Sequence, residues 1–89
     1  MAGIDWTREA LGHLELIRAY IEQFDPRAAD RFVARLIAAG KSFADVPNQG
    51  RPAVDGLREL PRVAPYIIQY EVDHEAVSIL RIKRGRQRR

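Results

Sequence analysis

The residues best suited to binding chemistry in this 89-residue chain are basic and gather toward its C-terminal end. From position 81 to position 89 there are six basic side chains and no acidic one. Lys and Arg make most protein contacts to phosphate, because their N–H groups donate charge-assisted hydrogen bonds. The candidate residues for binding a polyanionic or acidic partner are therefore Arg58, Arg62, Arg81, Lys83, Arg84 and Arg86. The alternative is a solvated basic tail that only promotes solubility.

Groups that could transfer protons are scarce beside these cations. Metal-free cleavage of RNA needs a base for the 2′-OH, a cation for the phosphate and an acid for the leaving oxygen. The titratable candidates are Glu59, Glu71, Tyr66 and Tyr70. The simpler interpretation of Glu59 is a charge partner for Arg58 or a neighbouring arginine, and the two tyrosines are typical of a core or sheet face. We therefore assign no catalytic residue.

The residue types also exclude several kinds of site. The chain has no cysteine, which rules out disulfides, thiolate zinc sites and cysteine nucleophiles. His13 has no metal-type partner one helical turn away, so we expect it on the surface, and His74 falls in a predicted turn. Neither a carboxylate cluster nor a Gly-rich phosphate loop is present, so we expect no metal and no cofactor. No signal peptide or membrane-length apolar run is present, and we expect a cytoplasmic location.

Charge is distributed unevenly along what we expect to be a single domain over residues 1–89. The net charge is +3, and the hydrophobic fraction of 46% is that of an ordinary globular protein. Residues 1–45 hold six Lys or Arg and seven Asp or Glu, whereas residues 46–89 hold nine and five. This asymmetry predicts an acidic or polyanionic partner at one surface.

Two amphipathic helices are predicted in the first half of the chain. The first spans residues 8–23, with Thr7 as its N-cap, and has apolar residues at helical spacing. Asp25-Pro26 starts the second, which runs to about Phe43. Gly40 interrupts it and indicates either a close backbone contact or a fraying end. The short connection predicts an antiparallel helical hairpin.

The second half has the composition of β-strands. Strands are predicted at residues 57–63, 65–72 and 76–83, with a hairpin turn at 73–75, and residues 2–6 form a short edge strand. Strict alternation places Val77, Ile79, Arg81 and Lys83 on one face of the last strand and Ser78, Leu80 and Ile82 on the other. The fold class is therefore α+β: a short N-terminal strand, a two-helix antiparallel hairpin, then a three-stranded antiparallel sheet.

Short motifs in this order carry a family resemblance over nearly the whole chain. They are Trp6-Thr7 with Ala10, Ile17 with Tyr20-Ile21, Pro26 with Ala28-Ala29, Pro47 with Gly50-Arg51, Arg58-Glu59-Leu60, Tyr66 to Tyr70, and Val77 to Ile82 before Arg84-Gly85-Arg86. With these motifs the chain resembles the RelE/ParE superfamily of bacterial type II toxin-antitoxin toxins, and its details are closer to the ParE branch.

The resemblance implies a small toxin silenced by a cognate antitoxin. ParE-like toxins are associated with inhibition of DNA gyrase, whereas RelE-like toxins cleave mRNA in the ribosomal A site. RelE-like nucleases commonly present a Tyr or His near the C-terminus, and the segment after Leu80 has neither. Arg84 stands where many relatives carry His, and arginine is a poor base.

We therefore expect a non-enzymatic toxin that inhibits DNA gyrase. The alternatives are a ribosome-dependent mRNA endonuclease and an inactive toxin that only binds its antitoxin. The resemblance implies an acidic, ParD-like antitoxin, which would add a strand to a sheet edge or place a helix in a groove. It also implies a toxin-antitoxin hetero-oligomer in which the antitoxin binds the operator, so we expect no direct sequence-specific DNA binding by this chain.

Overall fold

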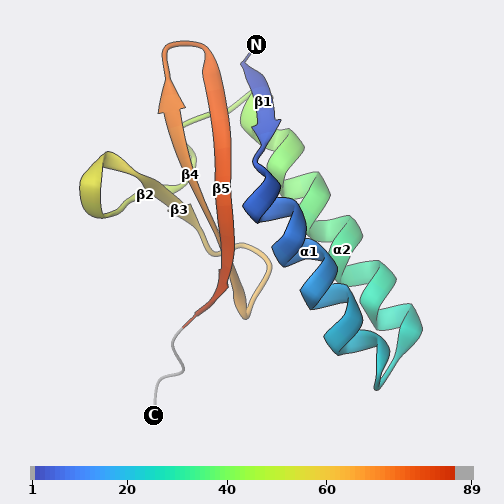
Figure 1. The fold of residues 1–89 in the computed structure, drawn as a ribbon. Helices are drawn as coiled ribbons and strands as arrows, with labels where there is room; N and C mark the ends of the chain where they lie inside the picture. The colour runs from blue at the N-terminus through green and yellow to red at the C-terminus, as the bar shows by residue number, and fades with distance from the viewer. Residues whose placement is uncertain (1, 86–89) are drawn as a thin grey trace.

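A computed structural model describes residues 2–85 and shows a five-stranded sheet beside a helical hairpin (Figure 1). The elements follow the order β1 (Gly3–Trp6), α1 (Arg8–Glu22), α2 (Pro26–Lys41), β2 (Arg51–Pro52), β3 (Arg58–Leu60), β4 (Tyr66–Asp73) and β5 (Ala76–Arg84). Short 3-10 turns lie at Ser42–Ala44 and Val54–Gly56. The predicted α+β class is confirmed.

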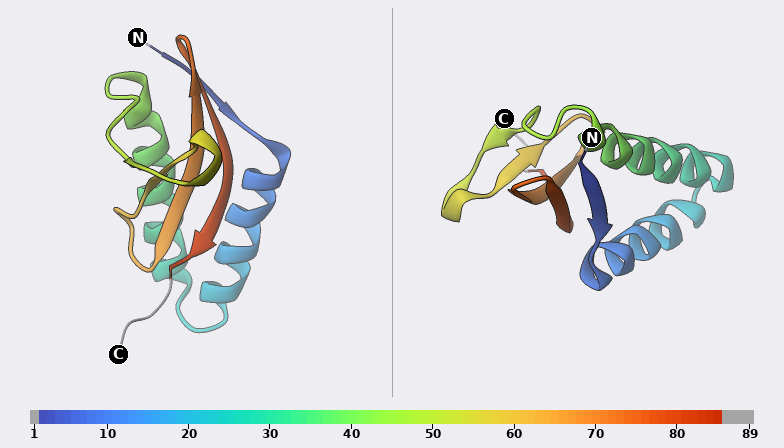
Figure 2. Two further views of the ribbon diagram at one scale, coloured as in Figure 1. Left: turned by 90° about the vertical axis from the view of Figure 1, so that its left-hand side faces the viewer. Right: turned by 90° about the horizontal axis from the view of Figure 1, so that it is seen from above.

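Both helices begin at the predicted caps. The Thr7 hydroxyl accepts a hydrogen bond from the Ala10 N–H at 3.2 Å, and the Asp25 carboxylate accepts from the N–H groups of Arg27 and Ala28, each at 3.1 Å. These bonds satisfy N–H groups that have no partner within the helix. Figure 2 shows α1 and α2 side by side on the same side of the sheet.

The strands lie in the order β1-β5-β4-β3-β2, so β4 is the middle strand and β5 is an interior strand between β1 and β4. The predicted three-stranded antiparallel sheet is β3, β4 and β5. The N-terminal strand β1 adds to it in parallel with β5, and β2 pairs with β3 at the other edge. β3 ends at Leu60, earlier than predicted, because Pro61 has no N–H to donate to a ladder.

A β-bulge in β5 makes the predicted alternation wrong. Tyr70 pairs with Ile79, and its neighbour Gln69 pairs with Arg81, so Leu80 is an extra residue without an opposite partner. The extra residue reverses the side-chain alternation beyond it. Ile82 therefore joins Val77 and Ile79 in the core, while Arg81 and Lys83 turn to the opposite face.

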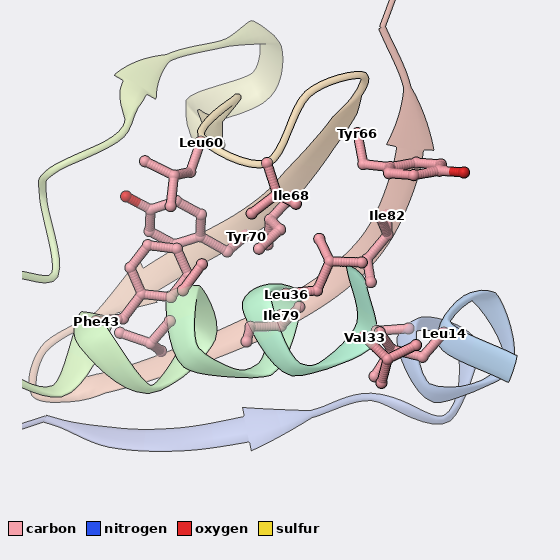
Figure 3. Packing of buried hydrophobic residues seen from close by; sticks show 14 of the residues in the cluster. Leu14, Val33, Leu36, Phe43, Leu60, Tyr66, Ile68, Tyr70, Ile79 and Ile82 are labelled. Carbon is pink, nitrogen blue, oxygen red and sulfur yellow. The ribbon is translucent and has the colours of Figure 1, made fainter. Parts of the chain in front are cut away.

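The core fills the space between the helices and one face of the sheet, which we call the inner face. This face carries Ile68, Tyr70 and Ile79. In Figure 3, Phe43 lies against Tyr70, and their ring centroids are 3.9 Å apart. Gly40 lies within α2 and is buried against Trp6 and Ile79, where an added Cβ would overlap the indole ring. The close-contact interpretation of Gly40 is therefore correct.

Candidate functional site

The outer face of the sheet carries a row of polar side chains that crosses four strands. Arg51 of β2 lies opposite Glu59 of β3, Glu59 opposite Gln69 of β4, and Gln69 opposite Arg81 of β5. The side chains are also linked. The Gln69 amide donates to Glu59 at 3.1 Å, Arg81 donates to the Gln69 side-chain oxygen, and Arg51 lies 3.5 Å from Glu59. We call these four residues the polar row.

Two further charged residues, Lys83 and Glu9, contact the polar row. Lys83 Nζ lies 2.8 Å from a Glu59 oxygen, and Arg81 Nε lies 3.5 Å from the Glu9 carboxylate on α1. Gln69 is buried and the Glu59 side chain is only 13% exposed, so both need these partners to offset their lost hydration. The row thereby connects the sheet to α1.

The environment of Glu59 favours its charged form. The hydrogen bond from Lys83 is the main reason that the pKa of Glu59 lies below its ordinary value of 4.5, and the positive charge of Lys83, the Gln69 amide and Arg51 add to the effect. Partial burial opposes the shift. A carboxylate held in this way is a weak general base. Glu59 is thus a charge partner, as expected, although its partners are Lys83 and Arg51 instead of Arg58.

The structure places the predicted basic residues on two faces. Arg81 and Lys83 lie on the outer face, in ion pairs. Arg58 follows the opposite alternation and donates to the Gly50 carbonyl at 2.5 Å, and Arg62 donates to the Gln49 side chain. Both therefore support the loop that leads into β2. Arg86 lies outside the described residues, and a role in binding stays a prediction for all six.

Arg84 lies at an apolar groove between α1 and the ends of β4 and β5. The groove has a volume of about 190 Å³ and is lined mostly by carbon; its residues are His13, Leu16, Ile17, Tyr66, Ile82 and Arg84. We call it the α1 groove. Leu16 of its lining, Tyr20 on α1 and Phe24 just after α1 are 68%, 54% and 72% exposed. Such exposure of neighbouring large apolar side chains is typical of a protein-binding surface.

His13 is more than the surface residue that the sequence predicts. Its side chain is 29% exposed, and Nδ1 accepts a hydrogen bond of 3.0 Å from the Ile82 N–H. Thr7 acts similarly, since its hydroxyl lies 2.8 Å from the Ile79 carbonyl and 3.1 Å from the Leu80 carbonyl. These α1 contacts protect the edge of β5 beyond the end of β1.

The candidate tyrosines belong to the core, as expected. Tyr70 is fully buried, donates from its hydroxyl to the Pro47 carbonyl at 2.8 Å and accepts from the Gly50 N–H at 2.9 Å. Tyr66 is 7% exposed and packs edge-to-face on Phe32. Glu71 is exposed on β4 opposite Ser78.

Sequence reasoning did not identify Gln69 or Glu9 as members of the site. Gln69 has an ordinary outward-facing position by alternation, and its importance depends on which residues lie opposite it. Glu9 lies in the first turn of α1, where a negative charge suits the helix dipole, but its partner Arg81 is 72 residues away. To find Gln69, the pairing register of β3, β4 and β5 would have been needed. To find Glu9, the position of α1 against β5 would have been needed.

Within residues 2–85, no group of three or more His, Cys, Asp or Glu side chains is arranged to hold a metal ion. None of the helices in this part of the chain has the length and apolar character needed to cross a membrane.

Comparisons with known proteins agree on one family. Residues 4–89 match the model of the ParE toxin of the type II toxin-antitoxin system parDE. The chain is 48% identical to Toxin RelE2 of Caulobacter vibrioides over 83 residues, which cover 93% of this chain and 94% of the relative. It is 43% identical to Putative toxin Y4kP of Sinorhizobium fredii over 86 residues, 94% of this chain and 88% of the relative.

A solved structure described as the chromosomal ParDE TA system from P. aeruginosa has the same fold. Its TM-score is 0.84 at 32% identity, and the match covers 97% of this chain and 98% of the other.

Proposed function

Because this chain belongs to the ParE toxin family of type II toxin-antitoxin systems, we propose that it is a non-enzymatic toxin that inhibits DNA gyrase until an antitoxin binds it. The observation that carries the proposal is that the side chains best suited to proton transfer are engaged in holding the fold together. The alternative of RNA cleavage requires at least one of them to act as an acid or a base.

Three of these groups have structural partners. Glu59 is held in its charged form by Lys83 and Gln69. The Tyr70 hydroxyl is buried and makes one bond as donor and one as acceptor. His13 uses Nδ1 to accept from the backbone of Ile82. Releasing any one of them would break a hydrogen bond that the fold uses.

One observation favours the RelE-type alternative. The α1 groove brings His13, Tyr66 and Arg84 together, which are the residue types of a metal-free ribonuclease. Its lining is mostly apolar, however, whereas a site for a phosphodiester needs several polar donors. We therefore assign the α1 groove to a protein partner.

The antitoxin is the partner that we assign to the α1 groove. An amphipathic antitoxin helix would cover the exposed Leu16, Tyr20 and Phe24 with its apolar face and place a carboxylate near Arg84. The similar solved structure described as the chromosomal ParDE TA system from P. aeruginosa supports an antitoxin as partner. Burial of two aromatic rings would supply the central anchors that protein interfaces need.

The target is tested with the purified chain and purified gyrase. We expect micromolar toxin to inhibit DNA supercoiling and raise the amount of covalent gyrase-DNA complex, and equimolar antitoxin to reverse both effects. Arg84→Gln tests the predicted basic surface, and Arg8→Gln, at the exposed start of α1, is the charge-matched control.

A translating extract provides the opposing measurement. Cleavage of message that appears only with ribosomes, and that is lost in His13→Ala and Tyr66→Phe, would overturn the proposal in favour of the endonuclease.

A further inference from the structure

Three arginines lie on the outer face of α2, in its first ten residues. Arg27, Arg31 and Arg35 recur every four residues and are all exposed. Four residues of helix turn through 400°, so the three side chains fall within a sector of about 80° and extend over about 12 Å of helix axis. We call them the α2 arginine row.

Small residues and a further cation continue this surface. Ala34 and Ala38 are also exposed on α2, and their short side chains leave the arginines projecting. A hollow of about 220 Å³ lies at the end of the row, lined by Arg35, Ala38, Ala39, Arg62 and Val63. Arg62 of the β3–β4 connection therefore adds a fourth guanidinium, and Arg35 is also positioned by the Phe32 ring, 5.9 Å from the ring centroid.

Acidic neighbours do not neutralise the α2 arginine row. Among residues 2–85, the ion pairs within 4 Å involve other basic residues. Asp30, the acidic residue of α2, pairs instead with Arg18 of α1 at 2.6 Å. The positive charge of the row is therefore available to a ligand.

The row is also unfavourable for the helix that carries it. Like charges four residues apart repel each other, and this occurs twice, between Arg27 and Arg31 and between Arg31 and Arg35. Arg27 lies in the first turn, where the helix dipole favours negative charge, and that turn has no acidic residue. Local electrostatic conflicts of this kind are expected where a surface serves binding.

The chemistry of the surface indicates the kind of partner. The large apolar residues that are exposed within residues 2–85 lie on or just after α1 and in the loops, and none is on α2. A protein interface normally has an apolar centre. A row of guanidiniums without such a centre suits the phosphates of a nucleic acid backbone, where affinity comes mainly from counterion release.

We propose that Arg27, Arg31, Arg35 and Arg62 form a sequence-independent binding surface for the phosphodiester backbone of nucleic acid. This surface is separate from the α1 groove and goes beyond the proposed action on gyrase. It gives the toxin a weak affinity for nucleic acid near its target. Because the expected contacts are to phosphates alone, we expect binding to be independent of base sequence.

The test is fluorescence anisotropy of the full chain with a labelled 20-base-pair DNA duplex at several salt concentrations. Each neutralised phosphate contributes about −0.9 to the slope of log K against log salt. The variant Arg27→Gln/Arg31→Gln/Arg35→Gln is expected to bind more than tenfold more weakly in low salt and to lose about 2.7 units of slope. A shuffled duplex should bind equally well.

The control removes positive charge elsewhere, in Arg8→Gln/Arg51→Gln, and should lose less than a third of that slope. Far-UV circular dichroism and a melting temperature no lower than that of the unmodified chain establish that the α2 variant is folded. An RNA duplex of the same sequence shows which nucleic acid is preferred, and either preference supports a phosphodiester ligand.

Three results would overturn the proposal. They are equal losses of slope per removed charge in the α2 variant and the control, unchanged binding in the α2 variant, and competition by polyglutamate as effective as that by duplex DNA. The last result would identify an acidic protein segment as the ligand.

Discussion

The two helices of the hairpin bury similar apolar residues but present different outer faces. α1 exposes Leu16 and Tyr20, followed by Phe24, and carries acids among its cations, whereas α2 exposes arginines and alanines. Packing against the same sheet explains why the inner faces of both helices are apolar. It does not determine which residues the outer faces carry. This difference is the basis of the two proposed binding surfaces, an apolar one on α1 for a protein and a cationic one on α2 for a polyanion.

The largest expected effect is on antitoxin binding at α1. Tyr20→Ala/Phe24→Ala should weaken binding of the antitoxin by about 2–4 kcal/mol, because buried aromatic anchors dominate protein interfaces. Isothermal titration calorimetry measures the loss. Both residues are more than half exposed, so the melting temperature should change little. The triple Gln variant of the α2 arginine row is the control, and an equal loss there would remove the distinction between the two helices.

The next effect concerns how α2 is held to the sheet. Gly40→Ala places a methyl group against Trp6 and Ile79, and should lower the free energy of unfolding by about 1–3 kcal/mol despite the better helix propensity of alanine. Urea denaturation measures the change. Gly12→Ala on α1 has open space at the Cβ position and should be neutral or stabilising. A stable Gly40→Ala variant would show that α2 can move away from the sheet.

Glu59 of the polar row should make the stability of the fold sensitive to acid. Because the pKa of Glu59 is lower in the folded protein, its contribution is complete above the unfolded value near 4.5 and is lost as pH falls below it. Glu59→Gln should cost about 1–2 kcal/mol at pH 7 and reduce the loss of stability between pH 5 and pH 3. Melting temperatures across that range provide the test. Glu71→Gln, at an exposed position on β4, is the control that removes the same charge.

A smaller effect tests the attachment of α1 to β5. His13→Ala leaves the Ile82 N–H without its acceptor and should cost about 1 kcal/mol of unfolding free energy. His13→Asn places an oxygen near the position of Nδ1 and should recover most of that loss. Chemical denaturation of both variants measures the difference, and equal stabilities would show that the hydrogen bond contributes nothing.

The smallest expected effect is a gain in stability, not a loss. Arg31→Gln removes two like-charge contacts from α2 and should raise the free energy of unfolding by a few tenths of a kcal/mol at low salt. Thermal melts in low and high salt test this, since salt should abolish the gain. Arg18→Gln on α1 is the contrasting variant, because it removes the ion pair with Asp30 and should not stabilise. A loss of stability in Arg31→Gln would show that the row supports the helix.

The fold could be predicted from the sequence largely because its signals are local. The caps at Thr7 and Asp25 and the turn before Ala76 each depend on neighbouring residues. The bulge at Leu80 could not be found in this way, because it is defined by the partner strand. It also moved Arg81 and Lys83 to the face opposite the core, so an alternation that correctly describes Val77 and Ile79 gave the wrong face for the basic residues.

The candidate site was less predictable for the same reason. Its cations were recognised by type, but their partners Gln69 and Glu9 come from distant segments. His13 was expected on the surface because no ligand partner lies one turn away, whereas its true partner is a backbone N–H of β5. The arginines of α2 were counted in the charge balance only. The structure adds that Asp30 pairs with Arg18 of α1, so it does not neutralise these arginines.

The most direct test of the proposed function follows DNA and protein synthesis separately after the toxin alone is induced in bacteria. Pulse labelling with thymidine and with methionine measures the two rates in the same culture, and a His13→Ala/Tyr66→Phe variant shows whether these two groups of the α1 groove are needed. The proposal predicts that DNA synthesis falls first, with a DNA-damage response, in both strains. An earlier fall in protein synthesis that disappears in the variant would contradict it and identify the chain as an RNA-cleaving enzyme.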